Sequence, residues 1–344
     1  MFFGRRRNGG GSAVAEADRL AGGGRLGEAI ALLDEANRGS RDSEVERRIR
    51  HLRHLAGIAL LENPATEPRF VEASPDLPSV GPDSRVPEIG PEELTPEVLR
   101  GSILTHGCLL VRGLMDREKS LSMAADIDRS FEVRGALSEG EFDSDGFYDE
   151  MNAEEPFAVT ERSWVEEGGG VLACDSPRLL FDMLEAFGEA GLRELIADYL
   201  GETPAISAQK CTLRKATPDV SGAWHQDGKF LGDVRSLNVW LSLSRCGDVA
   251  PSMDIVPRRI DEIVEVGTDD ATFSIQVSDA MAARVAGDAG IVRPIFEPGD
   301  ALLFDELFLH QTGSDPSMPN PRYAIESWFF GPSAYPDGYV PIAF

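Results

Sequence analysis

The order of two apolar patterns is the feature that most constrains the fold of this chain. Up to residue 200 the apolar residues recur mainly at helical spacing, and the last such segment covers 176–200. After it, short apolar runs typical of strands take over. These runs cover 205–213, 236–243, 253–256, 301–304 and 323–330. A chain with helices first and strands later is expected to be an α+β protein built around a β-barrel or sandwich.

The first 62 residues are expected to form a small helical segment. Helical patterns cover 13–21, 26–37 and about 42–61. The first two patterns resemble one tetratricopeptide repeat, because Ala17, Ala29 and Ala36 fall where that repeat packs small residues. Repeat arrays normally need about three units, and the sequence shows no second copy. The segment 1–62 is therefore expected to dock on the main domain, to mediate a homodimer or to contact another protein.

Residues 63–87 are expected to be a linker, because proline is frequent there and proline blocks helix interiors. The main domain is expected over 88–344. Its first patterns predict helices at 97–105 and 117–131 and a strand at 108–112. An acidic stretch with aromatic residues follows at 135–170. It predicts either a lid or substrate loop or an ordinary surface loop.

The charge of the chain bears on its partners. It has 33 basic and 59 acidic residues, and its formal charge is −26. Such a field repels nucleic acid and anionic membranes, so neither is expected as a partner. The basic residues 1–7 are not followed by the apolar run of a signal peptide, and a disordered tail is expected. Four cysteines without a CxxC pair favour a reducing, cytoplasmic location.

A candidate metal-binding pattern is the segment Trp-His-Gln-Asp-Gly at 224–228. Alternate side chains of a strand share a face, so His225 and Asp227 are expected to point to one place. A His-x-Asp triplet is common by chance, and its weight depends on its context. Downstream, a Pro-Gly-Asp turn leads into the strand expected at 301–304, and His310 follows a few residues later.

Two histidines and one carboxylate form the facial triad that non-haem Fe(II) oxygenases use. Three protein ligands leave three positions of an octahedral ion open, which suits a chelating 2-oxoacid and O2. Arg322 opens the last expected strand, where a buried arginine needs an anionic partner. Its guanidinium suits the far carboxylate of such a cosubstrate.

The region from about residue 205 to 330 resembles the phytanoyl-CoA dioxygenase family of Fe(II)/2-oxoglutarate-dependent oxygenases. That family has Trp-His-x-Asp, a segment like the Leu-Asn-Val-Trp-Leu-Ser-Leu at 237–243, an Ile-Val-Pro strand, Pro-Gly-Asp, a histidine and an arginine, and this chain has each in order. The resemblance implies a double-stranded β-helix (jelly-roll, cupin-like) core with flanking helices. It implies His225, Asp227 and His310 as catalytic iron ligands and Arg322 as the 2-oxoglutarate anchor, with O2 as the second cosubstrate.

Two features depart from the family pattern. Many members have Pro-Gly-Ser-His at the Ile-Val-Pro strand, whereas this chain has Val-Pro-Arg-Arg at 256–259, which leaves the substrate contacts open. Arg258 and Arg259 either recognise an anionic group of the substrate or are solvated. The spacing from His310 to Arg322 is also one residue longer than the resemblance implies. Halogenating relatives replace the carboxylate ligand with a small residue, so Asp227 favours hydroxylation or a related oxidation.

Further residues near the pattern are candidates for cosubstrate binding. Asn238 lies on the following strand and Lys215 on the preceding one, and both are predicted to bind 2-oxoglutarate. Lys210 and Arg214 are candidates of the same kind, and a solvated or packing role is an equal alternative for all four. Trp224 is expected to pack in the core.

The predicted function is hydroxylation of an unactivated C–H bond in a small-molecule metabolite, with release of succinate and CO2. The alternative is a non-catalytic or differently metallated jelly-roll binding protein that carries an N-terminal protein-interaction module. The sequence leaves the identity of the substrate open.

Overall fold

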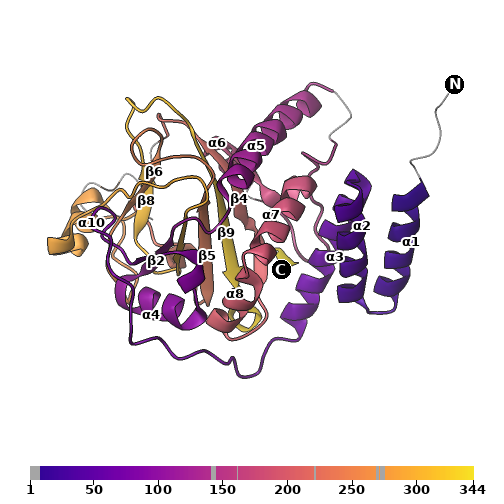
Figure 1. Ribbon diagram of the computed structural model, residues 1–344, viewed down its shortest axis with the longest axis horizontal. Helices are drawn as coiled ribbons and strands as arrows, with labels where there is room; N and C mark the ends of the chain where they lie inside the picture. Colours follow the sequence, from indigo (N-terminus) through magenta and orange to yellow (C-terminus); the bar gives the residue numbers. More distant parts are fainter. Residues whose placement is uncertain (1–7, 141–144, 161, 221, 269–270, 272–275) are drawn as a thin grey trace.

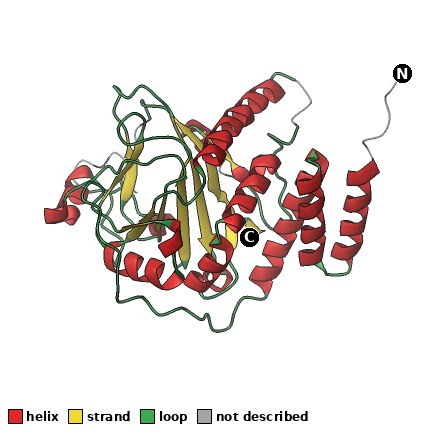
Figure 2. Cartoon of the chain, viewed as in Figure 1, coloured by secondary structure: helices red, strands yellow, loops and turns green. Residues whose placement is uncertain are grey.

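The computed structural model describes residues 8–140, 145–160, 162–220, 222–268, 271 and 276–344. Its centre is a large sheet flanked by helices (Figures 1 and 2). The strands of this sheet follow the order β1-β2-β7-β5-β9-β4-β10, and β3 also pairs with β4. Their bounds are β1 Glu88–Ile89, β2 Cys108–Val111, β3 Gly170–Leu172, β4 Ala205–Ala216, β5 Ser236–Ser242, β7 Ala301–Phe304, β9 Arg322–Phe330 and β10 Pro341–Ala343. Only the β1–β2 pair is parallel among the described pairs, so the sheet is mixed.

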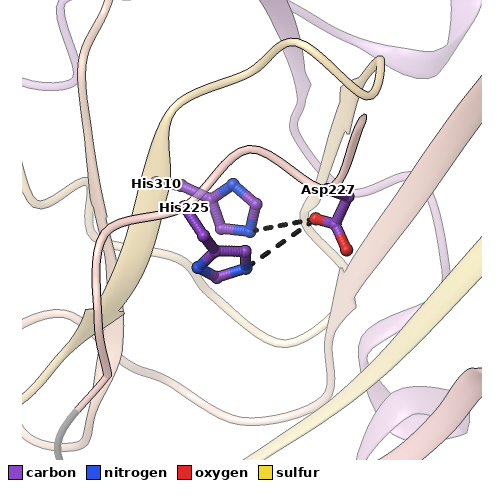
Figure 3. Close-up of side chains that lie close together, drawn as sticks. All are labelled: His225, Asp227 and His310. Atoms are coloured by element: carbon purple, nitrogen blue, oxygen red, sulfur yellow. Dashed lines mark ion pairs between the residues drawn. The ribbon is translucent and has the colours of Figure 1, made fainter. Parts of the chain in front are cut away.

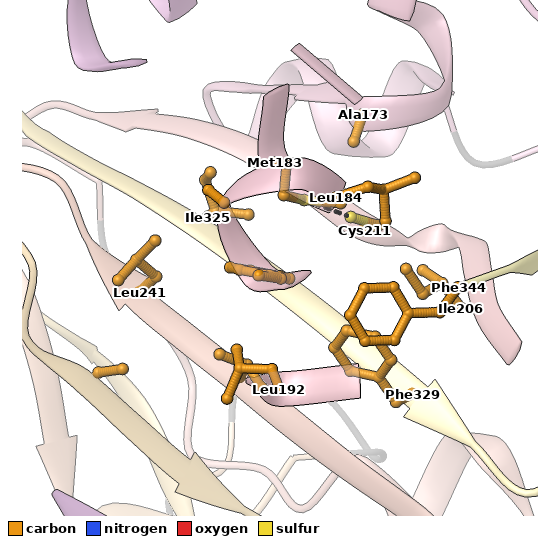
Figure 4. Close-up of a cluster of buried hydrophobic side chains, with 14 of the residues drawn as sticks. Ala173, Met183, Leu184, Leu192, Ile206, Cys211, Leu241, Ile325, Phe329 and Phe344 are labelled. Carbon is orange, nitrogen blue, oxygen red and sulfur yellow. Dashed lines mark hydrogen bonds between the residues drawn. The ribbon is translucent and has the colours of Figure 1, made fainter. Parts of the chain in front are cut away.

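One face of the large sheet is covered by helices. These are α4 (Pro96–His106), α5 (Arg117–Ser138), α7 (Pro177–Glu189) and α8 (Leu192–Leu200). Met183 and Leu184 of α7 and Leu192 of α8 pack with Leu241 and Ile325 of the sheet (Figure 4). Burial of this apolar surface is the main stabilising contribution on this side.

The other face of the large sheet packs against a second, smaller sheet. Strands β6 (Ser252–Ile255) and β8 (His310–Gly313) pair antiparallel. Isolated bridges extend the pair on both sides, joining Trp224 to Val277, His225 to His310 and Ile255 to Val292. Trp240 and Trp328 of the large sheet share one apolar cluster with Met253 and Ile255 of β6. The two sheets therefore enclose a common interior, and the candidate metal-binding pattern lies on the smaller one.

Three helices precede the linker: α1 (Asn8–Gly22), α2 (Leu26–Gly39) and α3 (Ser43–Glu62). They agree with the helical patterns, except that α1 begins five residues earlier than expected, in a glycine-rich stretch. The tail expected at 1–7 lies outside the described residues. Helix α3 lies against β10, and a Cβ on Gly57 would meet the backbone of Pro341 at 2.8 Å. Buried Arg53 donates to Asp34 of α2 at 2.9 Å and to the Ala343 carbonyl at 3.2 Å, so this segment is tied to the C-terminal strand.

The helical region expected over 176–200 consists of two helices, α7 and α8, because Gly191 takes a left-handed conformation (φ 72°) between them. In the irregular stretch expected at 135–170, α5 continues to Ser138 and α6 forms at Arg162–Glu167. The remaining short helices are α9 (Gly228–Leu231), α10 (Asp279–Ala286) and the 3-10 turns Pro91–Glu93, Ala173–Asp175, Gly287–Ala289 and Pro332–Ala334.

None of the described helices combines the length and the apolar character that crossing a membrane would require.

Candidate metal centre

The side chains of His225, Asp227 and His310 converge on one point (Figure 3). Their ligand atoms all lie within 4.8 Å of one another. Oδ2 of Asp227 is 3.8 Å from Nε2 of His225 and 3.9 Å from Nε2 of His310. Within the described part of the chain this is the one cluster of histidine, cysteine and acidic side chains close enough to hold a metal ion.

Backbone pairing places the two histidines side by side. The His225 amide donates to the His310 carbonyl at 3.0 Å, and the His310 amide donates back at 3.1 Å. The imidazole centroids consequently lie 4.4 Å apart. Asp227 is placed differently from our expectation, because it adopts helical dihedral angles (φ −62°, ψ −29°) immediately before α9. The carboxylate reaches the histidines because the backbone turns at Asp227. The alternation of side chains along a strand, on which our expectation rested, is not the cause.

Both imidazoles are oriented by the backbone. Nδ1 of His225 donates to the Ala223 carbonyl at 2.7 Å, and Nδ1 of His310 donates to the Phe308 carbonyl at 3.0 Å. A carbonyl can only accept, so each Nδ1 carries a proton, and in the neutral ring each Nε2 then presents a lone pair to the shared point. Metal-binding histidines are held in this way, with the second ring nitrogen donating to a carbonyl or carboxylate.

Gln226, between two of the triad residues, braces the surrounding loops. Its side chain is buried and donates to the carbonyls of Glu262 (3.1 Å) and Leu307 (2.6 Å). Its Oε1 accepts the amide of Val264 at 2.7 Å. The sequence pattern treats this position as variable, yet the amide here satisfies three backbone groups and fixes the loop that leads into His310.

The negative charge of Asp227 is balanced by a buried lysine. Nζ of Lys210 donates to Oδ1 of Asp227 at 2.9 Å, which leaves Oδ2 directed at the histidines. Burial disfavours the ionised carboxylate, but Lys210 and the two histidines outweigh it and lower the pKa of Asp227 to about 2. Burial and the neighbouring His225 lower the pKa of His310 to about 4. At neutral pH, Asp227 and His310 are therefore in the protonation states that metal binding needs.

Arg322 is almost fully buried and incompletely paired. It is 2% exposed, and its NH1 donates to the Ser252 carbonyl at 3.2 Å. Its Nε has no hydrogen-bond partner among the described residues, and the guanidinium lies 5.4 Å from the ring of Trp240. A buried cation with an unsatisfied donor is costly unless an anion completes its environment. Arg322 thus has the properties expected of an anion-binding residue.

Asn238 is a second incompletely paired group on the same face of the sheet. It is 3% exposed, lies opposite Phe304 and Trp328, and its Oδ1 has no partner within the described chain. Ring contacts connect this region to the triad, since the Phe304 and His310 centroids are 5.0 Å apart. The buried amide can therefore bind a polar ligand near the cluster.

The structure does not bring Lys215 to the triad. Its neighbours Cys211 and Leu213 on β4 pack with the helix-covered core, and Lys215 points the same way. Its Nζ pairs with Asp128 of α5 at 2.5 Å. Lys210, from the opposite face of the same strand, reaches Asp227 instead.

Sequence reasoning missed Glu326, which lies on the inner face of β9. Arg214 donates to its two carboxylate oxygens at 3.3 and 2.9 Å, and Arg322 lies 3.6 Å from Oε1. The only available signal was a charged residue in the middle of an otherwise apolar strand, which requires a partner when it is buried. The arginine that supplies the partner is one of the candidates weighed for the cosubstrate.

The Pro-Gly-Asp turn before β7 supports the scaffold. Gly299 has φ 99°, and a Cβ there would collide with the Met115 carbonyl, so only glycine fits. Asp300 accepts the amides of Gly113 and Glu297 at 2.9 Å each, and Arg112 at 2.8 Å. The turn therefore locks β7 to the loop after β2.

The two arginines at 258–259 are engaged within the protein. Arg259 pairs with Asp305, whose Oδ1 accepts the amide of Leu307 at 3.1 Å. Arg258 donates to the Val285 carbonyl at 3.2 Å. Arg259 therefore supports the loop before His310. Trp224 packs in the core as expected, with its Nε1 donating to Asp279 at 2.9 Å.

Comparison with solved structures finds matches at low sequence identity. No family model matches the chain, so the resemblance to phytanoyl-CoA dioxygenases is not confirmed, and no curated protein matches either. A structure of EctD from S. alaskensis with 2-oxoglutarate and 5-hydroxyectoine is 16% identical, with 79% of this chain and 85% of that chain covered and a TM-score of 0.49. The epimerase SnoN, in complex with Fe3+, alpha ketoglutarate and nogalamycin RO, is 15% identical, with 71% and 86% covered and a TM-score of 0.43. AviO1 from Streptomyces viridochromogenes is 17% identical, with 71% and 98% covered and a TM-score of 0.42.

Proposed function

We propose that this chain is a non-haem oxygenase that depends on Fe(II) and 2-oxoglutarate. The observation that carries the proposal is the convergence of two Nε2 atoms and one carboxylate oxygen within 4.8 Å. This donor set, free of thiolates, suits Fe(II) with open positions for a chelating cosubstrate and O2. His225, Asp227 and His310 would hold the metal.

The proposal assigns 2-oxoglutarate to the interior between the two sheets. Arg322 offers a buried guanidinium with an unsatisfied donor, which suits the distal carboxylate of the cosubstrate. Asn238 offers a buried amide beside the triad. Lys210 keeps Asp227 ionised and turns its second oxygen toward the histidines. With its iron, 2-oxoglutarate and O2 bound, a centre of this class supplies an oxidant for an unactivated C–H bond and releases succinate and CO2.

Hydroxylation of a small-molecule metabolite is the reaction that we propose. The triad keeps its carboxylate at Asp227, which fills the coordination position that a halide would need. The two facing sheets around the triad support the proposed double-stranded β-helix, in which catalytic side chains project into the interior. In this proposal residues 88–344 are the catalytic domain, 63–87 the linker and 1–62 the helical segment.

Anaerobic titration tests the proposal. We expect one Fe(II) per chain, and addition of 2-oxoglutarate should produce a metal-to-ligand charge-transfer band in the visible spectrum. His225→Ala and His310→Ala should abolish the band, because each removes one of three ligands. His51→Ala is a matched control, since His51 lies on α3, is part-exposed and belongs to no ligand cluster.

The same titration distinguishes the proposed oxygenase from the alternative function. A wild-type chain that binds another divalent ion and gives no band with 2-oxoglutarate would be a differently metallated binding protein. Equal Fe(II) binding by His225→Ala and the wild type would remove the triad from the proposal altogether.

A further inference from the structure

A carboxylate occupies an unexpected place in the interior of this protein. Glu326 lies on β9 opposite Trp240 of β5 and Thr212 of β4, on the face that packs toward the smaller sheet. Its negative charge favours the protonated form of both His310 and Arg322, and so acts to raise the pKa of each. Glu326 is therefore within electrostatic reach of both the triad and the residue proposed to anchor 2-oxoglutarate.

An anion at this position works against binding of a dicarboxylate. Its side chain is 25% exposed, and although burial opposes ionisation, Arg214 and Arg322 hold the pKa of Glu326 below its usual value, so it is charged. A negative charge beside the proposed cosubstrate site repels the incoming carboxylate at the reduced dielectric constant of a protein interior. It also attracts Arg322, whose NH2 is already 3.6 Å away.

Arg214 offsets this charge. It binds Glu326 through Nε at 3.3 Å and NH2 at 2.9 Å, a two-pronged pairing that suits guanidinium and carboxylate. The contact to Arg322 is longer than a hydrogen bond. A third donor of Arg214, NH1, binds the Gly168 carbonyl at 2.8 Å and fixes the arginine in place. The hydrogen bonds to the Glu326 carboxylate described here thus come from Arg214 on β4.

The interior charges form two pairs and one excess cation. Lys210 pairs with Asp227 and Arg214 pairs with Glu326, each at 2.9 Å. Arg322 is the remaining cation, and it lies 3.6 Å from Glu326, beyond hydrogen-bond distance. If Arg214 were absent, Glu326 would be free to pair directly with Arg322, from which it is now 3.6 Å away. The anion-binding capacity of Arg322 therefore depends on Arg214.

We propose that Arg214 is a positioning residue for the cosubstrate, which neutralises Glu326 and so keeps Arg322 available for the distal carboxylate of 2-oxoglutarate. The inference rests on the proposed function, because it concerns the cosubstrate of that site. In this proposal the Arg214–Glu326 pair controls the affinity for the cosubstrate, and Arg214 does not contact the iron.

A double-mutant cycle tests this role. The dissociation constant of 2-oxoglutarate is measured anaerobically on the full-length chain loaded with Fe(II), by calorimetry and by the charge-transfer band. Arg214→Ala should weaken binding by about tenfold or more, because an uncompensated charge acts at low dielectric constant. Glu326→Gln should bind at least as tightly as the wild type. The double variant Arg214→Ala/Glu326→Gln should recover most of the loss, and Arg214→Lys should recover part of it.

Recovery in the double variant separates this role from a structural one. If Arg214 only stabilised the fold, removing Glu326 as well would leave binding as weak as in Arg214→Ala, and that result would overturn the proposal. Unchanged binding in Arg214→Ala would overturn it too. The matched control is Arg293→Ala, which breaks the two-pronged pair with Asp254 at 2.7 and 3.0 Å beside β6 and should leave binding unchanged. A wild-type protein that takes up Fe(II) but no 2-oxoglutarate would overturn the proposed function and this inference together, whereas tight wild-type binding with a failed cycle would overturn the inference alone.

Discussion

Replacement of Lys210 by methionine is the perturbation that most directly tests how the carboxylate of the candidate metal centre is held. Methionine keeps an unbranched side chain of similar length and removes both the charge and the hydrogen bond that Nζ donates. In the wild type, Nζ of Lys210 lies 2.9 Å from Oδ1 of Asp227, and the two side chains are 18% and 8% exposed. The variant therefore leaves an ionised carboxylate in a buried position without its main counter-charge.

The magnitude follows from the pKa of Asp227. That pKa is lowered from 3.8 to about 2, which corresponds to about 2 kcal/mol of folding free energy for the ionised form. Loss of one partner of a buried pair typically costs about 3–5 kcal/mol, because the remaining charge has no compensation. We expect Lys210→Met to lower the free energy of unfolding of the metal-free protein by about 3 kcal/mol at neutral pH.

The effect has a defined pH dependence. Because the folded pKa of Asp227 is depressed, its stabilising contribution is complete above pH 3.8 and is lost as the pH falls toward about 2. In the variant, the two histidines alone oppose the effect of burial, so the pKa of this carboxyl is higher than in the wild type and acid neutralises it earlier. The difference in stability between the two proteins should therefore shrink as the pH falls from neutrality toward about 4.

Chemical denaturation of the metal-free proteins measures this difference. Added Fe(II) should raise the melting temperature of the variant more than that of the wild type, since the ion supplies the missing positive charge. Lys215→Met is the matched control on the same strand, because its pair with Asp128 is exposed by 34% and 38% and such pairs contribute about 0–1 kcal/mol. Equal losses of stability in the two variants would refute this account of Lys210.

Three further predictions follow from local contacts. Histidine NMR of the metal-free protein should show His310 neutral down to about pH 5, because burial and His225 lower its pKa to about 4. The free energy of unfolding should accordingly decline as the pH falls from 6.5 toward 4. A pKa near 6.5 in the NMR titration would show that His310 is not buried beside His225 as described. Asp300→Asn should reduce the free energy of unfolding by about 2 kcal/mol, since it weakens charge-assisted bonds that include Arg112, and should leave Fe(II) affinity unchanged. Gly57→Ala should lower the melting temperature and increase proteolysis of the first 62 residues, because its Cβ would meet Pro341 at 2.8 Å; an unchanged melting temperature would show that α3 moves freely on β10.

Much of the local structure could be predicted from the sequence. The strand expected at 301–304 has those bounds, and β9 begins only one residue earlier than expected, at Arg322. These elements are short apolar runs bounded by turn residues, a signal that depends on neighbouring residues alone. Strand β8 was not predicted, because the segment His310–Gly313 is polar and only partly buried, so it carries no strand pattern.

The facing direction of side chains was less predictable. Strand β5 is buried at all seven positions and β4 at most of its twelve, so their sequences lack the alternation that distinguishes an inner from an outer face. The pairing register of β4 also shifts between Ile206 and Cys211, so the face to which a side chain points cannot be counted along this strand from the sequence. For this reason we predicted Lys215 as a 2-oxoglutarate-binding residue and Lys210 only as a further candidate, although Lys210 is the one that faces the triad.

The sequence by itself determined the donor set of the candidate metal centre. The residue types, namely two histidines, one aspartate and a later arginine, can be read directly from the sequence, as can their order and spacing. Tertiary structure alone decided how they act together: a turn directs Asp227, carbonyls set the histidine tautomers, and Lys210 and the Arg214–Glu326 pair set the charge around the site. These features arise from segments up to 112 residues apart, and electrostatic balance depends on distances that only the folded chain defines.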